Sequence, residues 1–189
     1  MSNKFGRINL ILGCMFSGKT SELISRYNRY TIGGKKCLMI KYKNDIRYDK
    51  KMIVTHDNIK VDAIACGKLE EIDNLSLILD YSVICVDEVQ FYPDAPIYLE
   101  KWANMGKIVE ACGLNGTYDR TPFPIISELI PKAENITFLT AICRETGGLA
   151  VYSHLTKKQD GGNNDATKEL IGGAESYSAV DRQTYFLKS

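Results

Sequence analysis

Eight residues near the start of the chain have the types and spacing of a phosphate-binding loop: Gly13-Cys14-Met15-Phe16-Ser17-Gly18-Lys19-Thr20. They follow a short apolar run, residues 8–12, and precede a segment of helical character, residues 21–27. A loop that leaves a strand and opens a helix points its backbone N–H groups at phosphates. In such a loop Lys19 contacts the β- and γ-phosphates and the Thr20 hydroxyl coordinates Mg²⁺. A chance match is expected in roughly one chain of this size in a hundred, so the motif predicts a nucleoside triphosphate site.

Two adjacent acidic residues, Asp87 and Glu88, follow the run Ser82-Val83-Ile84-Cys85-Val86, which is typical of a buried strand. Ligands of α/β sheets bind at the carboxyl ends of the strands, beside a phosphate-binding loop. There Asp87 is placed to support Mg²⁺, and Glu88 to accept a proton from an attacking hydroxyl group or to polarise a water. The alternative is a structural role, in which the acids cap the turn at residues 90–94. Beside the loop, the pair predicts metal-assisted phosphoryl transfer.

The elements that must position these groups alternate along the chain. We expect strands at residues 8–12, 37–42, 60–66, 82–88, 107–112 and 136–142, and helices at 20–32, 69–79, 93–105 and 125–130. Gly33-Gly34 and Gly106 are typical helix ends, and the polar stretch 43–58 is expected to be an exposed loop. Strands that alternate with helices predict an α/β fold, with a P-loop parallel sheet flanked by helices.

The last part of the chain has a different character. From Arg144 onward it contains several glycine pairs, such as Gly161-Gly162 and Gly172-Gly173, with only brief apolar runs between them. This pattern predicts a small lobe with a β-hairpin and a mobile tip. We therefore expect an ATP-binding α/β domain over residues 1–142 and a small lobe over residues 143–189.

Composition limits the kinds of partner. Of the 189 residues, 25% are charged and the net charge is +1, so no field is expected that would gather nucleic acid or a membrane surface. No run approaches the roughly 20 apolar residues of a membrane span, and we expect no signal peptide at the polar start. The six cysteines form no CxxC pair, which favours buried free thiols in a reducing cytoplasm and shows no self-evident metal site.

Several ordered blocks of the sequence resemble the type II thymidine kinase family. They lie between residue 8 and about residue 185 and comprise residues 13–20, 45–48 with 55–57, 87–91, 113–118 with 122–123, 139–143, and 171–173 with Tyr177. A phosphate-binding loop alone is shared by many ATPases, whereas this ordered set is specific. The resemblance implies transfer of the γ-phosphoryl group of ATP, with Mg²⁺, to the 5′-hydroxyl group of thymidine. The product is dTMP for nucleotide salvage, and deoxyuridine is a further expected substrate.

The resemblance also implies roles for individual residues. Glu88 is the general base, and Lys19 with the loop amides neutralises charge on the phosphoryl oxygens. Asp45 and Arg47 act near the reacting phosphate, Arg47 as a catalytic residue, and their alternative is an ordinary solvated loop. The expected ATP and Mg²⁺ site comprises Gly13, Cys14, Met15, Phe16, Ser17, Gly18, Lys19, Thr20, Asp45, Arg47, Asp87 and Gln90, with Thr20 and Asp87 at the metal.

The nucleoside is expected to lie in an apolar and aromatic pocket that a lasso-like lobe covers. By position in the family its residues are Met15, Phe91, Leu114, Tyr118, Phe123, Leu170, Ile171, Gly172 and Tyr177. For single aromatic residues such as Phe123 the alternative is core packing. A lid suits a kinase because water would otherwise receive the phosphoryl group. The family further implies a homotetramer or homodimer, and inhibition by dTTP.

The chain departs from the family pattern at two places. Cys14 replaces a proline of the loop, at a position where any side chain fits, so we expect little consequence. The structural zinc site of the family uses two CxxC pairs, and its positions are occupied here by Cys143, Thr146, Asp181 and Thr184. Threonine is a poor zinc ligand, and a tetrahedral structural site needs four good ones. We therefore expect no zinc, and a lobe that depends on packing, oligomer contacts or ordering by substrate.

Two other functions fit the same residues. The chain could be an ATPase or a regulatory nucleotide-binding module without nucleoside kinase activity. It could also be a kinase of another deoxynucleoside, because base contacts made by the backbone leave few side chains from which to read specificity.

Overall fold

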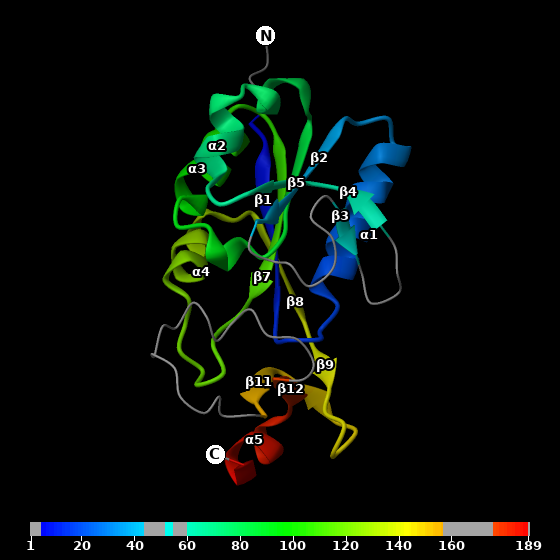
Figure 1. Cartoon of the computed structure of the whole chain (residues 1–189), viewed down its shortest axis with the longest axis vertical. Helices are drawn as coiled ribbons and strands as arrows, with labels where there is room; N and C mark the ends of the chain where they lie inside the picture. The colour runs from blue at the N-terminus through cyan, green and yellow to red at the C-terminus, as the bar shows by residue number, and fades with distance from the viewer. Residues whose placement is uncertain (1–4, 44–51, 55–59, 157–175, 189) are drawn as a thin grey trace.

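Six parallel strands form the central sheet of the computed structural model, which describes residues 5–43, 52–54, 60–156 and 176–188. The strands lie in the order β5-β2-β6-β7-β1-β8. Their bounds are β1 (Arg7–Gly13), β2 (Cys37–Tyr42), β5 (Ile64–Cys66), β6 (Val83–Val86), β7 (Ile108–Leu114) and β8 (Asn135–Leu139). Every pairing in this sheet is parallel, so the six carboxyl ends share one edge, which faces the terminal lobe in Figure 1. The predicted α/β fold is confirmed.

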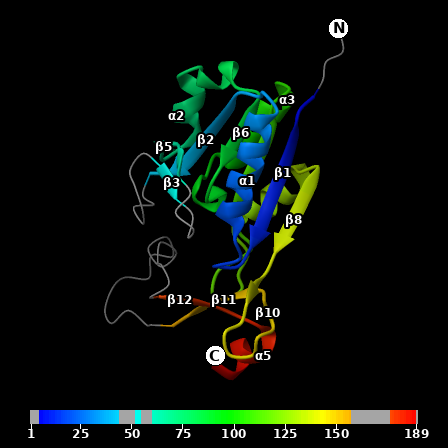
Figure 2. The same cartoon turned by 90° about the vertical axis from the view of Figure 1, so that its right-hand side faces the viewer.

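Helices cover both faces of the sheet (Figure 2). The core residues of α1 (Lys19–Ile32) pack on one face, and those of α2 (Leu69–Asn74), α3 (Ala95–Asn104) and α4 (Pro124–Leu129) pack on the other. Alternate residues of a strand point to opposite faces, so Leu10 and Leu12 of β1 join the larger cluster while Ile11 contacts the α1 side. In the described part of the chain, no helix is long and apolar enough to cross a membrane.

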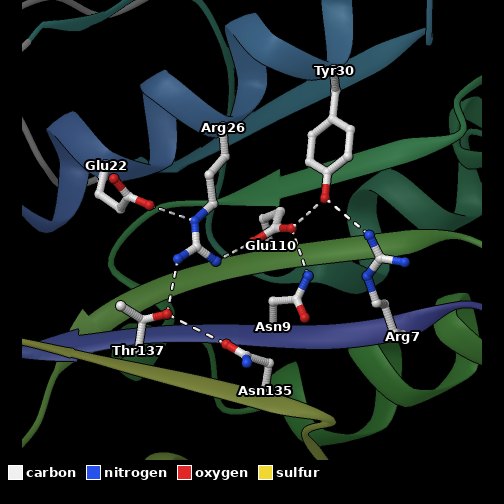
Figure 3. Close-up of polar contacts among 8 residues, drawn as sticks. All are labelled: Arg7, Asn9, Glu22, Arg26, Tyr30, Glu110, Asn135 and Thr137. Atoms are coloured by element: carbon white, nitrogen blue, oxygen red, sulfur yellow. Dashed lines mark hydrogen bonds and ion pairs between the residues drawn. The ribbon is translucent and has the colours of Figure 1, made fainter. Parts of the chain in front are cut away.

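A buried polar network joins α1 to the sheet (Figure 3). Glu110 of β7 is 1% exposed, and its carboxylate accepts hydrogen bonds from Asn9 Nδ2 at 2.6 Å and Tyr30 Oη at 2.8 Å. It also forms an ion pair of 2.9 Å with Nη1 of Arg26, in the middle of α1. Because a buried charge is stable only when it is paired and hydrogen-bonded, these contacts hold α1 in one place on the sheet. The first turn of α1 carries the end of the phosphate-binding loop.

The chain leaves the sheet at Thr140 and forms a small lobe at the carboxyl edge. Its elements are two antiparallel strand pairs, β9 (Ala141–Ile142) with β10 (Leu149–Ala150) and β11 (Tyr152–Leu155) with β12 (Tyr177–Val180), followed by α5 (Arg182–Lys188). Most of the buried apolar residues of the lobe form one cluster with Cys14 of the phosphate-binding loop, whereas Tyr177 belongs to the larger core cluster. The predicted hairpin is present, whereas the sequence analysis did not anticipate α5.

Several elements are shorter than the sequence predicts. The expected helix at 69–79 ends with α2 and resumes as a 3₁₀ helix (Leu77–Asp80), because Ser76 has φ 57°, which a continuous α-helix cannot include. The expected strand at 60–66 is two strands, β4 (Lys60–Asp62) and β5. The expected loop at 43–58 contains β3 (Met52–Val54), which pairs with β4, so that prediction was wrong there. Pro96 lies in the first turn of α3, where its missing N–H group breaks no hydrogen bond of the helix.

Candidate active site

The phosphate-binding loop lies between β1 and α1, as predicted. Gly13 ends β1, and a Cβ atom there would lie 2.4 Å from the carbonyl oxygen of Leu139 and 2.5 Å from Ser17 Oγ. Gly18 has φ 81°, in the left-handed region that side chains disfavour. Both glycines of the motif are therefore required by the path of the backbone, as a loop that wraps closely around phosphates demands.

The ammonium group of Lys19 lies against the inside of this loop. Lys19 is 8% exposed, and its Nζ donates a hydrogen bond of 2.8 Å to the carbonyl oxygen of Cys14. The hydroxyl of Ser17 donates to the same oxygen at 2.9 Å. The positive charge thus lies at the start of α1, where the free N–H groups and the helix dipole also favour an anion. The arrangement suits the phosphates of a nucleotide.

Thr20 and Asp87 meet at the mouth of the loop. The Thr20 hydroxyl lies 3.2 Å from Asp87 Oδ1 and 3.5 Å from Oδ2, although 67 residues separate the two in the chain. Hydroxyl and carboxylate oxygens beside a phosphate site are the donors that Mg²⁺ takes in nucleotide complexes, so these two residues fit that ion. Cys112 Sγ also lies 2.8 Å from Asp87 Oδ1, a contact that the sequence analysis missed.

Glu88, the predicted general base, lies beside Asp87 in a strained conformation. Its φ of 52° is unusual for a residue with a side chain, and such backbone strain is concentrated at functional sites. Its Oε2 accepts a hydrogen bond of 2.7 Å from Gln90 Nε2, and Gln90 Oε1 accepts one of 3.2 Å from the backbone N–H of Leu114. Gln90, which the sequence analysis assigned to the ATP site, therefore bridges the candidate base and a residue predicted to contact the nucleoside.

Five residues predicted to surround the nucleoside lie together. Met15, Leu114, Phe123 and Tyr177 belong to one buried hydrophobic cluster, each 8% exposed or less, and Tyr118 packs against it. They come from the phosphate-binding loop, β7, the segment that follows β7, and β12. The carboxyl edge of the sheet thus brings residues from distant parts of the chain to one place. The same cluster continues into the core under α3 and α4, so these side chains also have a packing role.

Phe91 joins this region through a residue that the sequence analysis did not select. Its ring stacks on Tyr42 at the end of β2, with ring centroids 5.1 Å apart, and Tyr42 packs against the same cluster. No motif marks Tyr42, because its proximity to Phe91 arises from the pairing of β2 with β6.

The terminal lobe contacts the phosphate-binding loop directly. The backbone N–H of Met15 donates a hydrogen bond of 3.0 Å to Ser153 Oγ of β11, and Cys14 Sγ donates one of 3.3 Å to the carbonyl oxygen of Ala150. Ser153 also lines a cleft between β11 and the segment after β7, whose other lining residues are Asn115, Gly116, Thr117, Arg120, Val151 and Tyr152. The hairpin sequence around Ser153 contains no motif from which this contact could have been predicted.

The segment that carries Tyr118 is held by α5. Tyr185 of α5 donates a hydrogen bond of 2.8 Å from its hydroxyl to the carbonyl oxygen of Tyr118. The guanidinium of Arg120 lies over the rings of Tyr185 and Phe186, 4.9 Å and 4.6 Å from their centroids. Cations over aromatic faces are attracted by the ring quadrupole, so α5 contacts this segment through both polar and aromatic groups.

The four residues at the zinc positions of the family also come together, but they bond to one another. The Thr146 hydroxyl donates to the carboxylate of Asp181, and Cys143 Sγ lies 3.4 Å from Thr184 Oγ1. Asp181 Oδ1 accepts a hydrogen bond of 2.8 Å from the backbone N–H of Thr184. Asp181 thereby caps the N-terminus of α5. One thiol, one carboxylate and two hydroxyls are not the four sulfur or nitrogen donors of a structural zinc site. These residues do not fit zinc.

These hydrogen bonds change two pKa values. A hydrogen bond from the Thr184 hydroxyl to the sulfur is the largest cause that lowers the pKa of Cys143, to about 6. The Thr146 hydroxyl and the backbone N–H of Thr184 lower the pKa of the Asp181 carboxyl. Hydrogen bonds to the charged form of an acid favour that form, so the contacts that link the β9–β10 turn to α5 are strongest when these acids are ionised.

Five of the predicted site residues lie outside the described part of the chain. They are Asp45 and Arg47, expected near the reacting phosphate, and Leu170, Ile171 and Gly172, expected over the nucleoside.

Comparison with known proteins agrees with this geometry. A family model described as thymidine kinase matches residues 6–185. The thymidine kinase of rabbit fibroma virus (strain Kasza) is 42% identical over 181 residues, which cover 96% of this chain and 97% of the relative. Thymidine kinase 1 of Dictyostelium discoideum is 42% identical over 184 residues, which cover 95% of this chain and 78% of the relative. The thymidine kinase of Variola virus (isolate Human/India/Ind3/1967) is 44% identical over 180 residues, which cover 95% of this chain and 97% of the relative. The chain belongs to the thymidine kinase family.

Proposed function

We propose that the chain transfers the γ-phosphoryl group of ATP to the 5′-hydroxyl group of thymidine, giving dTMP for nucleotide salvage, and that it also accepts deoxyuridine. Membership in the thymidine kinase family supports this activity. The observation that carries the proposal is the position of the two acids after β6. Asp87 contacts Thr20 of the phosphate-binding loop, and Glu88 is linked through Gln90 to Leu114. The acids therefore lie between the proposed phosphate site and the proposed nucleoside site.

Each of these groups has a distinct task in the reaction. Thr20 and Asp87 would hold Mg²⁺, which when bound neutralises charge on the phosphates. Lys19 and the N–H groups of the loop stabilise the charge that spreads over the oxygens of the transferred group. Glu88 accepts the proton of the 5′-hydroxyl group as its oxygen attacks, and this carboxylate is oriented by the amide of Gln90.

The nucleoside and lid residues complete the proposal. We assign residues 1–142 to the ATP-binding domain and residues 143–189 to a lasso lobe that covers the nucleoside. We also propose, on the resemblance to the family, that Asp45 and Arg47 act at the reacting phosphate. On the same ground we propose that Leu170, Ile171 and Gly172 cover the base. The residues proposed to surround it are Met15, Phe91, Leu114, Tyr118, Phe123 and Tyr177. The contact between Ser153 and the backbone of Met15 supports a lobe that acts next to the phosphates.

The cofactors and the cellular setting follow from the same reasoning. We propose that the enzyme uses ATP and Mg²⁺ and holds no zinc, since Cys143, Thr146, Asp181 and Thr184 form hydrogen bonds instead. All six cysteines are free, and five of them are buried, which supports a reducing cytoplasmic setting. Assembly into a homotetramer or homodimer and inhibition by dTTP are carried over from the family.

A phosphoryl-transfer assay tests the function. Radiolabelled ATP is incubated with the protein and thymidine, deoxyuridine or deoxycytidine, and nucleoside monophosphates are separated from free phosphate. Glu88→Gln should lower kcat for thymidine by about 10²–10⁴-fold, the range for loss of a general base. Its matched control is Glu128→Gln, which changes an exposed glutamate of α4 and should leave kcat unchanged.

Two outcomes would overturn the proposal. If ATP is hydrolysed at a rate that no nucleoside changes, the chain is an ATPase or a regulatory module. If deoxycytidine is phosphorylated in preference to thymidine, the acceptor is wrong although the reaction is right. Metal analysis of the purified protein tests the zinc proposal, because one bound equivalent of Zn²⁺ would contradict it.

A further inference from the structure

The thiol of Cys112 contacts the acid that is proposed to hold Mg²⁺. Cys112 Sγ lies 2.8 Å from Asp87 Oδ1, the same oxygen that lies 3.2 Å from the Thr20 hydroxyl. Both side chains are buried, Cys112 at 1% exposed and Asp87 at 5%. An ionised carboxylate only accepts hydrogen bonds, so the thiol is the donor. We propose that Cys112 is a positioning residue that sets the orientation of the Asp87 carboxylate and thereby the affinity of the site for the divalent cation.

The register of the sheet explains why these two residues meet. β6 and β7 pair in parallel, with Cys85 opposite Glu110 and Val86 opposite Ala111. One step further along both strands places Asp87 opposite Cys112. Side chains alternate between the faces of a sheet, and Cys85 and Cys112 both belong to the cluster on the α1 side. Asp87 and Cys112 therefore point to the face on which α1 begins with the phosphate-binding loop.

The contact adds a second restraint to the Asp87 carboxylate, which the Thr20 hydroxyl also contacts. Partners that hydrogen-bond to a metal-binding side chain hold it in the orientation that the metal requires, and their loss typically weakens metal affinity by about 10–100-fold. The S–H group is a weak donor, so the lower end of this range, about tenfold, is expected here.

A metal-binding measurement tests the role without relying on turnover. The probe is Mn²⁺, whose free concentration is read from its electron paramagnetic resonance signal, added to protein saturated with a non-hydrolysable ATP analogue. Cys112→Ala and Cys112→Val both remove the donor, one with a smaller and one with a larger side chain. If one of these variants fails to fold, the other still tests the role. Each should weaken Mn²⁺ binding by about tenfold. Cys112→Ser, which retains a donor, should bind Mn²⁺ nearly as tightly as the unchanged protein.

The matched control is Cys85→Ala. Cys85 is an equally buried free thiol on the same face of the sheet. Its replacement by alanine should leave the affinity for Mn²⁺ unchanged. If the donor-free Cys112 variants bind Mn²⁺ as tightly as Cys85→Ala does, or if Cys112→Ser binds as weakly as Cys112→Ala, the positioning role is wrong.

This inference rests on the proposed function, in which Asp87 holds the cation, and Asp87→Asn separates the two. If Asp87→Asn weakens Mn²⁺ binding and the Cys112 variants do not, only the role of Cys112 fails. If Asp87→Asn has no effect either, the metal site of the proposed function fails with it. A parallel loss of Mn²⁺ affinity in Asp87→Asn and Cys112→Ala supports both.

Discussion

Replacing Glu110 by alanine tests the network that holds α1 on the sheet. The carboxylate of Glu110 is 1% exposed and accepts hydrogen bonds from Asn9, Tyr30 and Arg26 (Figure 3). Removing one partner of a buried ion pair typically costs about 3–5 kcal/mol, because the other charge is left uncompensated. Arg26 retains its bond to Glu22 and its side chain is 16% exposed, so we expect a loss near the lower end, about 3 kcal/mol.

Equilibrium unfolding in urea measures this loss. With a slope of about 2 kcal/mol per molar urea, the midpoint of Glu110→Ala should fall by about 1.5 M, and its melting temperature by about 6–12 °C. Glu110→Gln keeps the volume and one acceptor, so its effect should be intermediate. The control is Glu22→Ala, which removes a 35% exposed partner of Arg26 within the same helix and should cost about 0.3–0.5 kcal/mol. Equal midpoints for Glu110→Ala and Glu22→Ala would refute the reasoning.

Three further predictions concern the site and the lobe. Gln90→Leu should lower kcat about tenfold, since it removes a hydrogen bond to the carboxylate of Glu88. The affinity for a fluorescent ATP analogue should stay unchanged. Weaker binding of the analogue would show instead that Gln90 contacts ATP. Gly13→Ala should abolish binding of the same analogue, because the new Cβ would lie 2.4 Å from a carbonyl oxygen of β8; retained binding would contradict the geometry. Since Thr146 lowers the pKa of Asp181 below its ordinary 3.8, the stabilising contribution of this acid is complete above that value and is lost as pH falls through the lowered pKa. The melting temperature of Asp181→Asn should therefore be lower than that of the unchanged protein at neutral pH, and this difference should disappear in acid. A difference in melting temperature that does not depend on pH would count against the hydrogen bond.

The sequence predicted most elements because local patterns control them. The apolar run at 8–12, the glycines of the loop and the helical segment after it correspond to β1, the loop and α1. The run before Asp87 corresponds to β6. These features depend on neighbouring residues, so they could be recognised without knowledge of the fold.

The errors arose where tertiary contacts override local preference. Nothing near Ser76 marks the residue that adopts φ 57° and ends α2. The sequence around α5 reads as a remnant of a zinc site, and it becomes a helix whose N-cap is Asp181 and whose ring contacts involve Arg120 of another segment. Such contacts join residues far apart in the chain, so no local pattern indicates them.

By itself, the sequence determined the chemical groups of this protein: a loop for phosphates, two acids after a buried strand, and a pair of threonines where the family has zinc ligands. Only the tertiary structure decided which groups meet. The order and register of the parallel strands bring Asp87 to Thr20 across 67 residues and set Cys112 against the same carboxylate. The turn after β6 likewise lets Gln90 join Glu88 to Leu114. Strand pairing is a long-range choice governed by the packing of the whole core, and for that reason these contacts could not be deduced from the spacing of residues.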